Sequence, residues 1–152
     1  MAIRTIVKDG DDILLKVSKP VEKLDGKLFQ LLDDLLETVE QVNGVGLAAV
    51  QVGVLRRVAI VLDLENDEVI ELINPEIIEQ SGEQHDVEGC LSFPGKYGMV
   101  TRAETVKVKS LTRDGDVKIY TGVGLTARAF CHEIDHMDGI VFGDKVDEWV
   151  NI

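Results

Sequence analysis

Two histidines near the end of the chain stand at the spacing that holds a metal ion on a helix. His132 and His136 are four residues apart, so a helix would place them one turn apart on the same face. Glu133 lies beside them and could take up a proton. Because the chain holds only three histidines, two of them in this pattern favour a metal site over a solvated polar helix. The chemistry expected here is metal-assisted hydrolysis.

A catalytic metal ion generally needs three protein ligands and one open position, so a third ligand must come from elsewhere. Cys90, within Glu88-Gly89-Cys90-Leu91-Ser92, is the best candidate because a thiolate binds Fe²⁺ and Zn²⁺ well. The alternative is that Cys90 is a small buried hydrophobic residue. Downstream of the histidines, three acidic residues stay open as ligands, and nothing distinguishes one of them: Asp144, Asp147 and Glu148.

A third segment, from Gly44 to Gly53, combines small residues with one polar candidate. Its glycines and alanines leave room for a ligand to approach the backbone closely. Gln51 follows an apolar run, and its amide could donate a hydrogen bond to a developing oxyanion. Taken alone, a glycine-rich loop before a strand is more often a turn, and the spacing is not that of a phosphate-binding loop.

The elements that must position these residues follow from hydrophobic periodicity. Helices are predicted from about residue 25 to 42, ended by Asn43-Gly44, and from about 125 to 137. Strands are expected at residues 57–64, 69–73, 105–109 and 117–120, with turns at 74–75 and 113–116. No linker or repeat divides the chain, so we expect one domain over residues 1–152. This order predicts an α+β fold with mainly antiparallel sheets packed around the metal-binding helix.

Composition argues against several classes of function. A formal net charge of −12 disfavours both nucleic-acid binding and docking on anionic membranes. We expect neither a membrane span nor a signal peptide, because the apolar runs are too short. A cytoplasmic protein is therefore expected, with Cys90 and Cys131 as thiols. Cys131 offers an alternative thiol ligand, but consecutive helical residues point about 100° apart, which disfavours it beside His132.

Taken together, the three segments closely resemble the peptide deformylase family. That family carries G-x-G-x-A-A-x-Q, E-G-C-L-S and H-E-x-D-H segments in this order. Here they are Gly44 to Gln51, Glu88 to Ser92 and His132 to His136, matched at every defining position. The resemblance extends over nearly the whole chain. It implies metal-dependent hydrolysis of the N-terminal formyl group of N-formylmethionyl nascent polypeptides, with release of formate.

The resemblance also implies a role for each residue of these segments. Three residues would hold one divalent metal ion: Cys90, His132 and His136. The ion would be Fe²⁺ natively, with Zn²⁺, Ni²⁺ or Co²⁺ as further candidates in the purified protein. Glu133 would take a proton from water and pass it to the leaving amine. Gln51 and the backbone N–H of Leu91 would stabilise the oxyanion.

Other residues would bind substrate or support the ligands. By resemblance, Gly46 would hydrogen-bond the substrate backbone, and Glu88 and Arg102 would form a supporting ion pair. Three apolar residues could line a pocket for the methionine side chain, or could equally be core: Val45, Leu125 and Ala129. Leu125 and Ala129 are seven and three residues before His132, which places them on the ligand face of the helix.

The expected partners are N-formylmethionyl peptides, with the ribosome as a transient partner. Some family members contact the ribosome through a longer C-terminal helix, whereas this sequence stops soon after Trp149, which puts that route in doubt. Two alternatives to an active deformylase are a catalytically idle metal-binding or ribosome-associated module and an H-E-x-x-H endopeptidase. The endopeptidase lacks a marked downstream ligand, and intact Glu133 and Gln51 favour the deformylase over the idle module.

Overall fold

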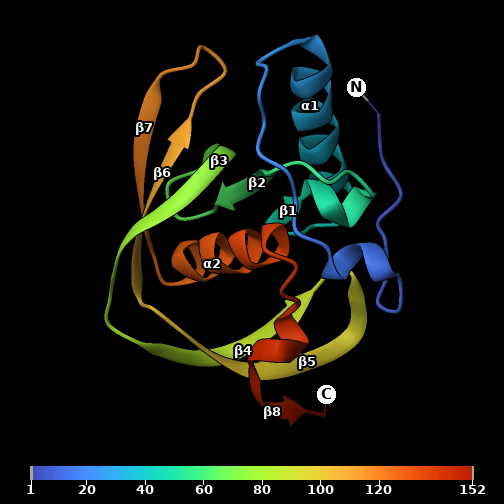
Figure 1. Ribbon diagram of the computed structural model, residues 1–152. Helices are drawn as coiled ribbons and strands as arrows, with labels where there is room; N and C mark the ends of the chain where they lie inside the picture. The colour runs from blue at the N-terminus through green and yellow to red at the C-terminus, as the bar shows by residue number, and fades with distance from the viewer. Residues whose placement is uncertain (1, 152) are drawn as a thin grey trace.

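Helix α2, Leu125–Met137, lies between two antiparallel sheets (Figure 1). The computed structural model describes residues 2–151, so Met1 and Ile152 of the predicted domain lie outside the described residues. The larger sheet has the order β1-β2-β3-β6-β7 and the smaller one the order β4-β5-β8. The larger sheet comprises β1 Gly46–Ala48, β2 Val58–Asp63, β3 Glu68–Ser81, β6 Thr105–Leu111 and β7 Val117–Val123. The smaller sheet comprises β4 Gln84–Cys90, β5 Phe93–Arg102 and β8 Val146–Val150.

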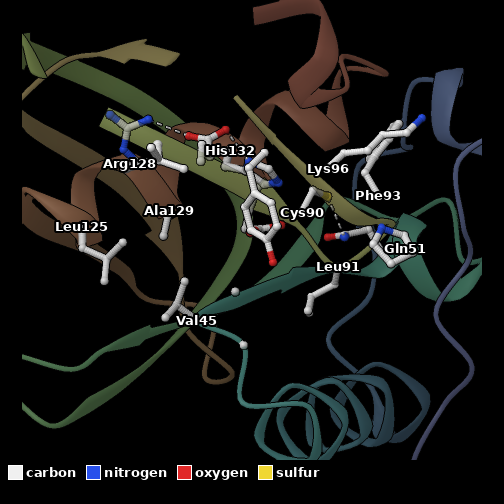
Figure 2. A pocket seen from close by; sticks show the side chains of 18 of the residues that line it. Val45, Gln51, Cys90, Leu91, Phe93, Lys96, Leu125, Arg128, Ala129 and His132 are labelled. Carbon is white, nitrogen blue, oxygen red and sulfur yellow. Dashed lines mark hydrogen bonds and ion pairs between the residues drawn. The ribbon is translucent and has the colours of Figure 1, made fainter. Parts of the chain in front are cut away.

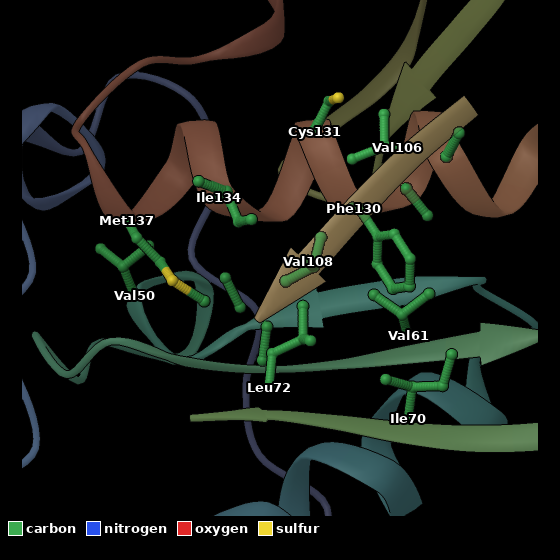
Figure 3. Packing of buried hydrophobic residues seen from close by; sticks show 14 residues of the cluster. Val50, Val61, Ile70, Leu72, Val106, Val108, Phe130, Cys131, Ile134 and Met137 are labelled. Carbon is green, nitrogen blue, oxygen red and sulfur yellow. The ribbon is translucent and has the colours of Figure 1, made fainter. Parts of the chain in front are cut away.

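One face of the larger sheet packs against α2 and forms the core that holds this helix in place. Phe130, Ile134 and Met137 of the helix meet a layer of strand residues that includes Val61 and Val108 (Figure 3). Each such side chain contributes about 1.5–3 kcal/mol by leaving water. Because the apolar side of α2 is buried here, its polar side, with the histidines, must turn away from the larger sheet.

The opposite face of the larger sheet is covered by α1, Gly26–Gln41. Asp25 caps this helix by accepting a hydrogen bond from the Leu28 N–H at 3.0 Å. Strand β2 is buried on both faces, with Val58 and Ile60 in the α1 core and Ala59 and Val61 in the α2 core. Three short 3₁₀ helices complete the described elements: η1 Asp12–Leu15, η2 Ala49–Val52 and η3 Phe142–Lys145.

The predicted helices and the predicted class are confirmed. Helices α1 and α2 cover the ranges expected from periodicity, and the sheets are antiparallel around α2. The turn expected at residues 113–116 is present, with Gly115 at φ +87° between β6 and β7. None of the helices in residues 2–151 combines the length and the apolar character needed to cross a membrane.

The turn predicted at residues 74–75 is wrong, because β3 runs on to Ser81. Asn74 has a φ of +48°, and the pairing with β6 shifts register between Ile73 and Glu76. A bulge of this kind admits Pro75, which cannot donate a hydrogen bond to the ladder. The sequence signal of a turn was therefore the signal of a bulge within one long strand.

Strands β1, β4, β5 and β8 were not predicted. The β4–β5 hairpin contains Gly89, Pro94, Gly95 and Gly98, which weaken any strand pattern in the sequence. Its pairing is set by tertiary contacts instead, since the Gly98 position packs against Val146 of β8. This hairpin carries the Glu88–Ser92 segment to the polar side of α2.

Candidate metal centre

The three predicted metal ligands converge at the polar face of α2. Their ligand atoms, from Cys90, His132 and His136, all lie within 4.8 Å of one another. Cys90 Sγ is 3.3 Å from His136 Nε2, which is 3.2 Å from His132 Nε2. Both histidines are buried, at 8 % and 0 % exposed. One thiol and two imidazoles whose donor atoms face a common point form a set that suits Fe²⁺ or Zn²⁺.

A buried carboxylate without a partner stands beside this cluster. Glu133 is 3 % exposed, and within residues 2–151 its Oε1 atom accepts no hydrogen bond. Burial raises the pKa of Glu133 to about 7, with the charge of His132 acting in the opposite direction. An orphaned carboxylate oxygen next to three converging ligand atoms fits a metal ion with a water molecule beside it.

Glu88 fixes the ring of His132 from behind. Glu88 Oε2 lies 2.8 Å from His132 Nδ1, and Arg102 donates to both Glu88 oxygens at 3.2 and 2.8 Å. Burial alone would raise the pKa of Glu88, but hydrogen bonds from His132 and Arg102 hold that pKa well below its usual range. Because Glu88 is then an acceptor only, His132 Nδ1 must donate, and in the neutral ring this leaves the lone pair of Nε2 free to bind an ion.

The amide of Gln51 is held in one orientation by two neighbours. Its Oε1 accepts from the Ala48 N–H at 3.0 Å, and its Nε2 donates to Ser92 Oγ at 3.2 Å. Nε2 also lies 3.6 Å from Cys90 Sγ, so the donor side of the amide faces the ligand cluster. Both Gln51 and Ser92 are buried, which makes this orientation rigid.

Gly46 of β1 lies directly against Glu133. A Cβ atom at position 46 would approach Glu133 Oε2 to 2.5 Å, so any side chain there would displace the carboxylate. Glycine therefore leaves the space that this position of the Glu133 carboxylate needs, in addition to any contact with substrate.

A cavity of about 460 Å³ opens from the ligand cluster to the surface. Leu125 and Ala129 lie on one side of it, and Cys90 and Gln51 lie on the other (Figure 2). Leu125 is 53 % exposed and forms part of the rim, whereas Ala129 is 5 % exposed and lies deeper. Such a volume with an apolar wall suits a medium-sized apolar side chain with part of a peptide.

The structure brings the predicted site residues together around this cavity. Those that line it are Val45, Gly46, Gln51, Glu88, Cys90, Leu91, Leu125, Ala129, His132 and Glu133. His136 and Arg102 lie behind the lining, as a candidate ligand and as a partner of Glu88. The acidic alternatives Asp144, Asp147 and Glu148 are not part of the ligand cluster found among residues 2–151.

Cys131 also stands apart from the ligand cluster. Its side chain belongs to the core between α2 and the larger sheet, and burial raises the pKa of its thiol. A buried thiol with a raised pKa on that side of the helix is a structural residue.

Sequence reasoning missed three polar residues that support the site. Ser92 orients Gln51, Asp135 accepts from Arg102 at 2.5 Å, and Arg128 donates to Glu88 Oε1 at 3.0 Å. Arg128 had a signal in its spacing, because it precedes His132 by four residues and so shares its helical face. Ser92 and Asp135 stand within the Glu88–Ser92 and His132–His136 segments, but no role for them was apparent from the sequence. The contacts of Ser92 and Asp135 join segments far apart in the chain.

The comparisons with protein families, with curated proteins and with solved structures all find the same family. The family model described as polypeptide deformylase matches residues 3–151. A peptide deformylase of Acetivibrio thermocellus is 55% identical over 151 residues, covering 99% of this chain and 88% of that protein. The crystal structure of a peptide deformylase from Legionella pneumophila has a TM-score of 0.90 at 46% identity, over 95% of this chain and 86% of that one. A Met-Ala-Ser-bound peptide deformylase from Acinetobacter baumannii has a TM-score of 0.88 at 37% identity, over 95% and 98%.

Proposed function

The chain belongs to the polypeptide deformylase family, whose metal-dependent members hydrolyse the N-formyl group of nascent polypeptides, and from this premise we propose which residues perform each step. The observation that carries the assignment is the convergence of the Cys90, His132 and His136 ligand atoms within 4.8 Å. The unpartnered Glu133 carboxylate beside them supplies the proton carrier that amide hydrolysis needs.

The substrate is an N-formylmethionyl peptide. The Acinetobacter baumannii relative was solved with Met-Ala-Ser bound, a peptide of the kind that deformylation releases. In this chain the methionine side chain would lie against Leu125, Ala129 and Val45, where it would cover the exposed Leu125. The backbone of Gly46 would hydrogen-bond the peptide, because β1 is an edge strand of the larger sheet.

Cys90, His132 and His136 would hold one divalent ion. When bound, that ion would polarise the formyl carbonyl and lower the pKa of a water molecule. Glu133 takes a proton from the attacking water and delivers it to the peptide nitrogen as the C–N bond breaks, releasing formate and a free amino terminus. Gln51 Nε2 and the Leu91 N–H donate to the formyl oxygen as negative charge develops on it.

The assignment is tested by formate release from three matched peptides. Formyl-Met-peptides should be hydrolysed far faster than acetyl-Met-peptides, because the acetyl methyl group would clash where the formyl hydrogen fits. Formyl-Asp-peptides should also be poor substrates, because a carboxylate beside apolar Leu125 and Ala129 is desolvated without a partner. Comparable rates on all three would contradict this function.

We propose Fe²⁺ as the native ion. A thiolate ligand donates more charge than a third imidazole would, so the identity of the ion should matter here. Protein stripped of metal and reloaded under nitrogen should be faster with Fe²⁺ than with Zn²⁺, and the iron form should lose activity in air. Metal analysis of protein purified anaerobically gives the second readout. Equal rates and equal stability in air would overturn the choice of iron but not the reaction.

We also propose that the protein works in the cytoplasm, where formylated chains are synthesised. Transient association with the ribosome stays a prediction, which co-sedimentation with ribosomes would test.

A further inference from the structure

Arg128 is a buried arginine that none of the proposed steps uses. It is 4 % exposed, lines the cavity, and lies one helical turn before His132 on α2. A guanidinium group in such a place is strongly unfavourable unless its charge and its N–H groups are matched. Its contacts therefore indicate what it does.

Each nitrogen of the Arg128 guanidinium group has a directed partner on the smaller sheet. Nη1 donates to Glu88 Oε1 at 3.0 Å, Nη2 to the Val100 carbonyl oxygen at 3.0 Å, and Nε to Gln84 Oε1 at 3.3 Å. Figure 2 shows the Arg128 side chain joined by a dashed line to the carboxylate next to His132. The planar group is therefore fixed between α2, β4 and β5.

Glu88 is consequently held at both oxygens by two arginines and one histidine. Its Oε1 accepts from Arg128 Nη1 and Arg102 Nε, and its Oε2 accepts from Arg102 Nη2 and pairs with His132 Nδ1. A carboxylate that makes these four contacts cannot rotate without losing charge-assisted hydrogen bonds. Its direction sets the ring plane of His132.

Charge balance gives a second reason for two arginines. Arg102 is shared, because its Nη1 donates to Asp135 while its other nitrogens bind Glu88. Two carboxylates, Glu88 and Asp135, are thus matched by two guanidinium groups, Arg102 and Arg128. Without Arg128, this buried cluster would carry an excess negative charge next to the ligands.

We propose that Arg128 is a positioning residue of the metal centre, acting through Glu88 to hold His132 in the orientation and tautomer that bind the ion. This rests on the assignment of His132 as a metal ligand made above. Groups behind metal-bound histidines typically change metal affinity by about 10- to 100-fold when removed. Arg128 therefore belongs functionally with Arg102, although it reaches Glu88 from the cavity side.

The test is the dissociation constant for Zn²⁺, measured by competition with a chromophoric chelator. Arg128→Met keeps a long side chain but loses the charge, and should bind Zn²⁺ about 10- to 100-fold more weakly than wild type. Arg128→Lys keeps the charge without the forked geometry, so its Zn²⁺ affinity should lie between those of wild type and Arg128→Met. The matched control is Arg113→Met, since Arg113 also bridges two carboxylates, Glu71 and Asp33, but lies outside the cavity. The Zn²⁺ affinity of Arg113→Met should equal that of wild type.

A second arm tests whether the effect passes through Glu88. In a Glu88→Gln background, adding Arg128→Met should change the Zn²⁺ affinity by no more than about twofold. A further large loss there would show that Arg128 acts by another route and would overturn the proposal.

The outcomes separate this proposal from the metal centre itself. If Arg128→Met and Arg128→Lys both bind Zn²⁺ within about twofold of wild type, the role of Arg128 is wrong and the metal centre stands. If wild type binds no Zn²⁺, or His132→Ala binds it equally well, the metal centre is wrong and this proposal falls with it. Should Arg128→Met fail to fold, the Arg128→Lys affinity decides.

Discussion

The packing around Glu133, and not a hydrogen bond to its Oε1, holds its carboxylate in place. It is buried, its Oε1 has no partner in residues 2–151, and Gly46 leaves space for Oε2. Such a group costs folding free energy, because a buried polar atom without a partner is unfavourable by about 1–3 kcal/mol. The cost is consistent with a residue kept for proton transfer and not for stability.

Glu133→Gln should therefore abolish most of the activity while keeping the metal. Glutamine preserves the shape but cannot accept the proton, so kcat/KM should fall by about 10²–10⁴-fold or more. Formate release and metal content measured on the same sample provide the check. His132→Ala is the contrasting variant, which should lose metal. A Glu133→Gln protein nearly as active as wild type would rule out this proton carrier.

At the scale of the elements, α2 carries most of the site on one face. Leu125, Ala129, His132 and His136 follow at helical spacing, and Phe130 and Ile134 on the other side anchor the helix to the larger sheet. The same helix thus supplies a pocket wall, two proposed metal ligands and core packing. Core packing fixes the direction of α2, and this in turn fixes the positions of the two histidines.

The extended N-terminal segment, residues 2–9, joins α1 to the catalytic segments. Asp34 of α1 accepts from the Ala2 N–H at 2.7 Å and from Arg4 Nε at 2.9 Å. Farther along, the Val7 N–H donates to the Gln51 carbonyl oxygen at 2.7 Å, and the Asp9 N–H donates to that of Ser92 at 2.7 Å. Loosening this segment should therefore disturb the backbone of Gln51, the proposed oxyanion donor.

Asp34→Asn should destabilise the protein in a pH-dependent way. Burial alone would raise the pKa of Asp34, but hydrogen bonds from Ala2, Gln30 and Arg4 lower it below its usual 3.8. Because the folded pKa is the lower one, the carboxylate stabilises the fold fully above about pH 4 and less as pH falls through the folded pKa. We expect a loss of about 1–3 kcal/mol at pH 7.

Denaturant unfolding of both proteins from pH 7 downward checks this expectation. The difference in free energy of unfolding should be constant from about pH 7 to 5 and shrink below about pH 4. A difference that stays constant to the lowest pH at which both are folded would contradict the role of the charged form.

At the scale of the whole molecule, the proposed metal centre lies where three parts of the fold meet. Cys90 comes from the smaller sheet, the histidines come from α2, and Gln51 follows β1 of the larger sheet. An ion bound there would cross-link the smaller sheet to α2 in the folded state only. Metal binding is therefore expected to stabilise the fold.

Metal removal should lower the melting temperature measurably. An ion at 100 times its dissociation constant adds about 2.7 kcal/mol, which for a chain of this size corresponds to about 5–10 °C. Calorimetry of stripped and reloaded protein measures the shift. His132→Ala should show no response to added metal, whereas Glu133→Gln should respond like wild type. A shift of equal size in His132→Ala would place the ion elsewhere.

The sequence by itself determined the local features of this protein. The spacing of His132 and His136 predicts one helical face, and the periodicity of residues 25–42 and 125–137 predicts both helices, because these patterns depend on neighbours within one or two turns. The α+β class followed from the order of the elements. Cys90 was the best candidate for a third ligand from its residue type, with a buried hydrophobic thiol as the alternative, and the resemblance to the family implied it as a ligand.

Only the tertiary structure decided which distant groups meet. The β4–β5 hairpin is poor in strand signals, and its pairing brings Glu88 to His132, 44 positions later in the chain. The same pairing encloses Arg128 between two sheets, and the bulge at Asn74 lets β3 continue where the sequence indicated a turn. Contacts of this kind depend on the summed packing of both sheets on α2, so no local pattern encodes them.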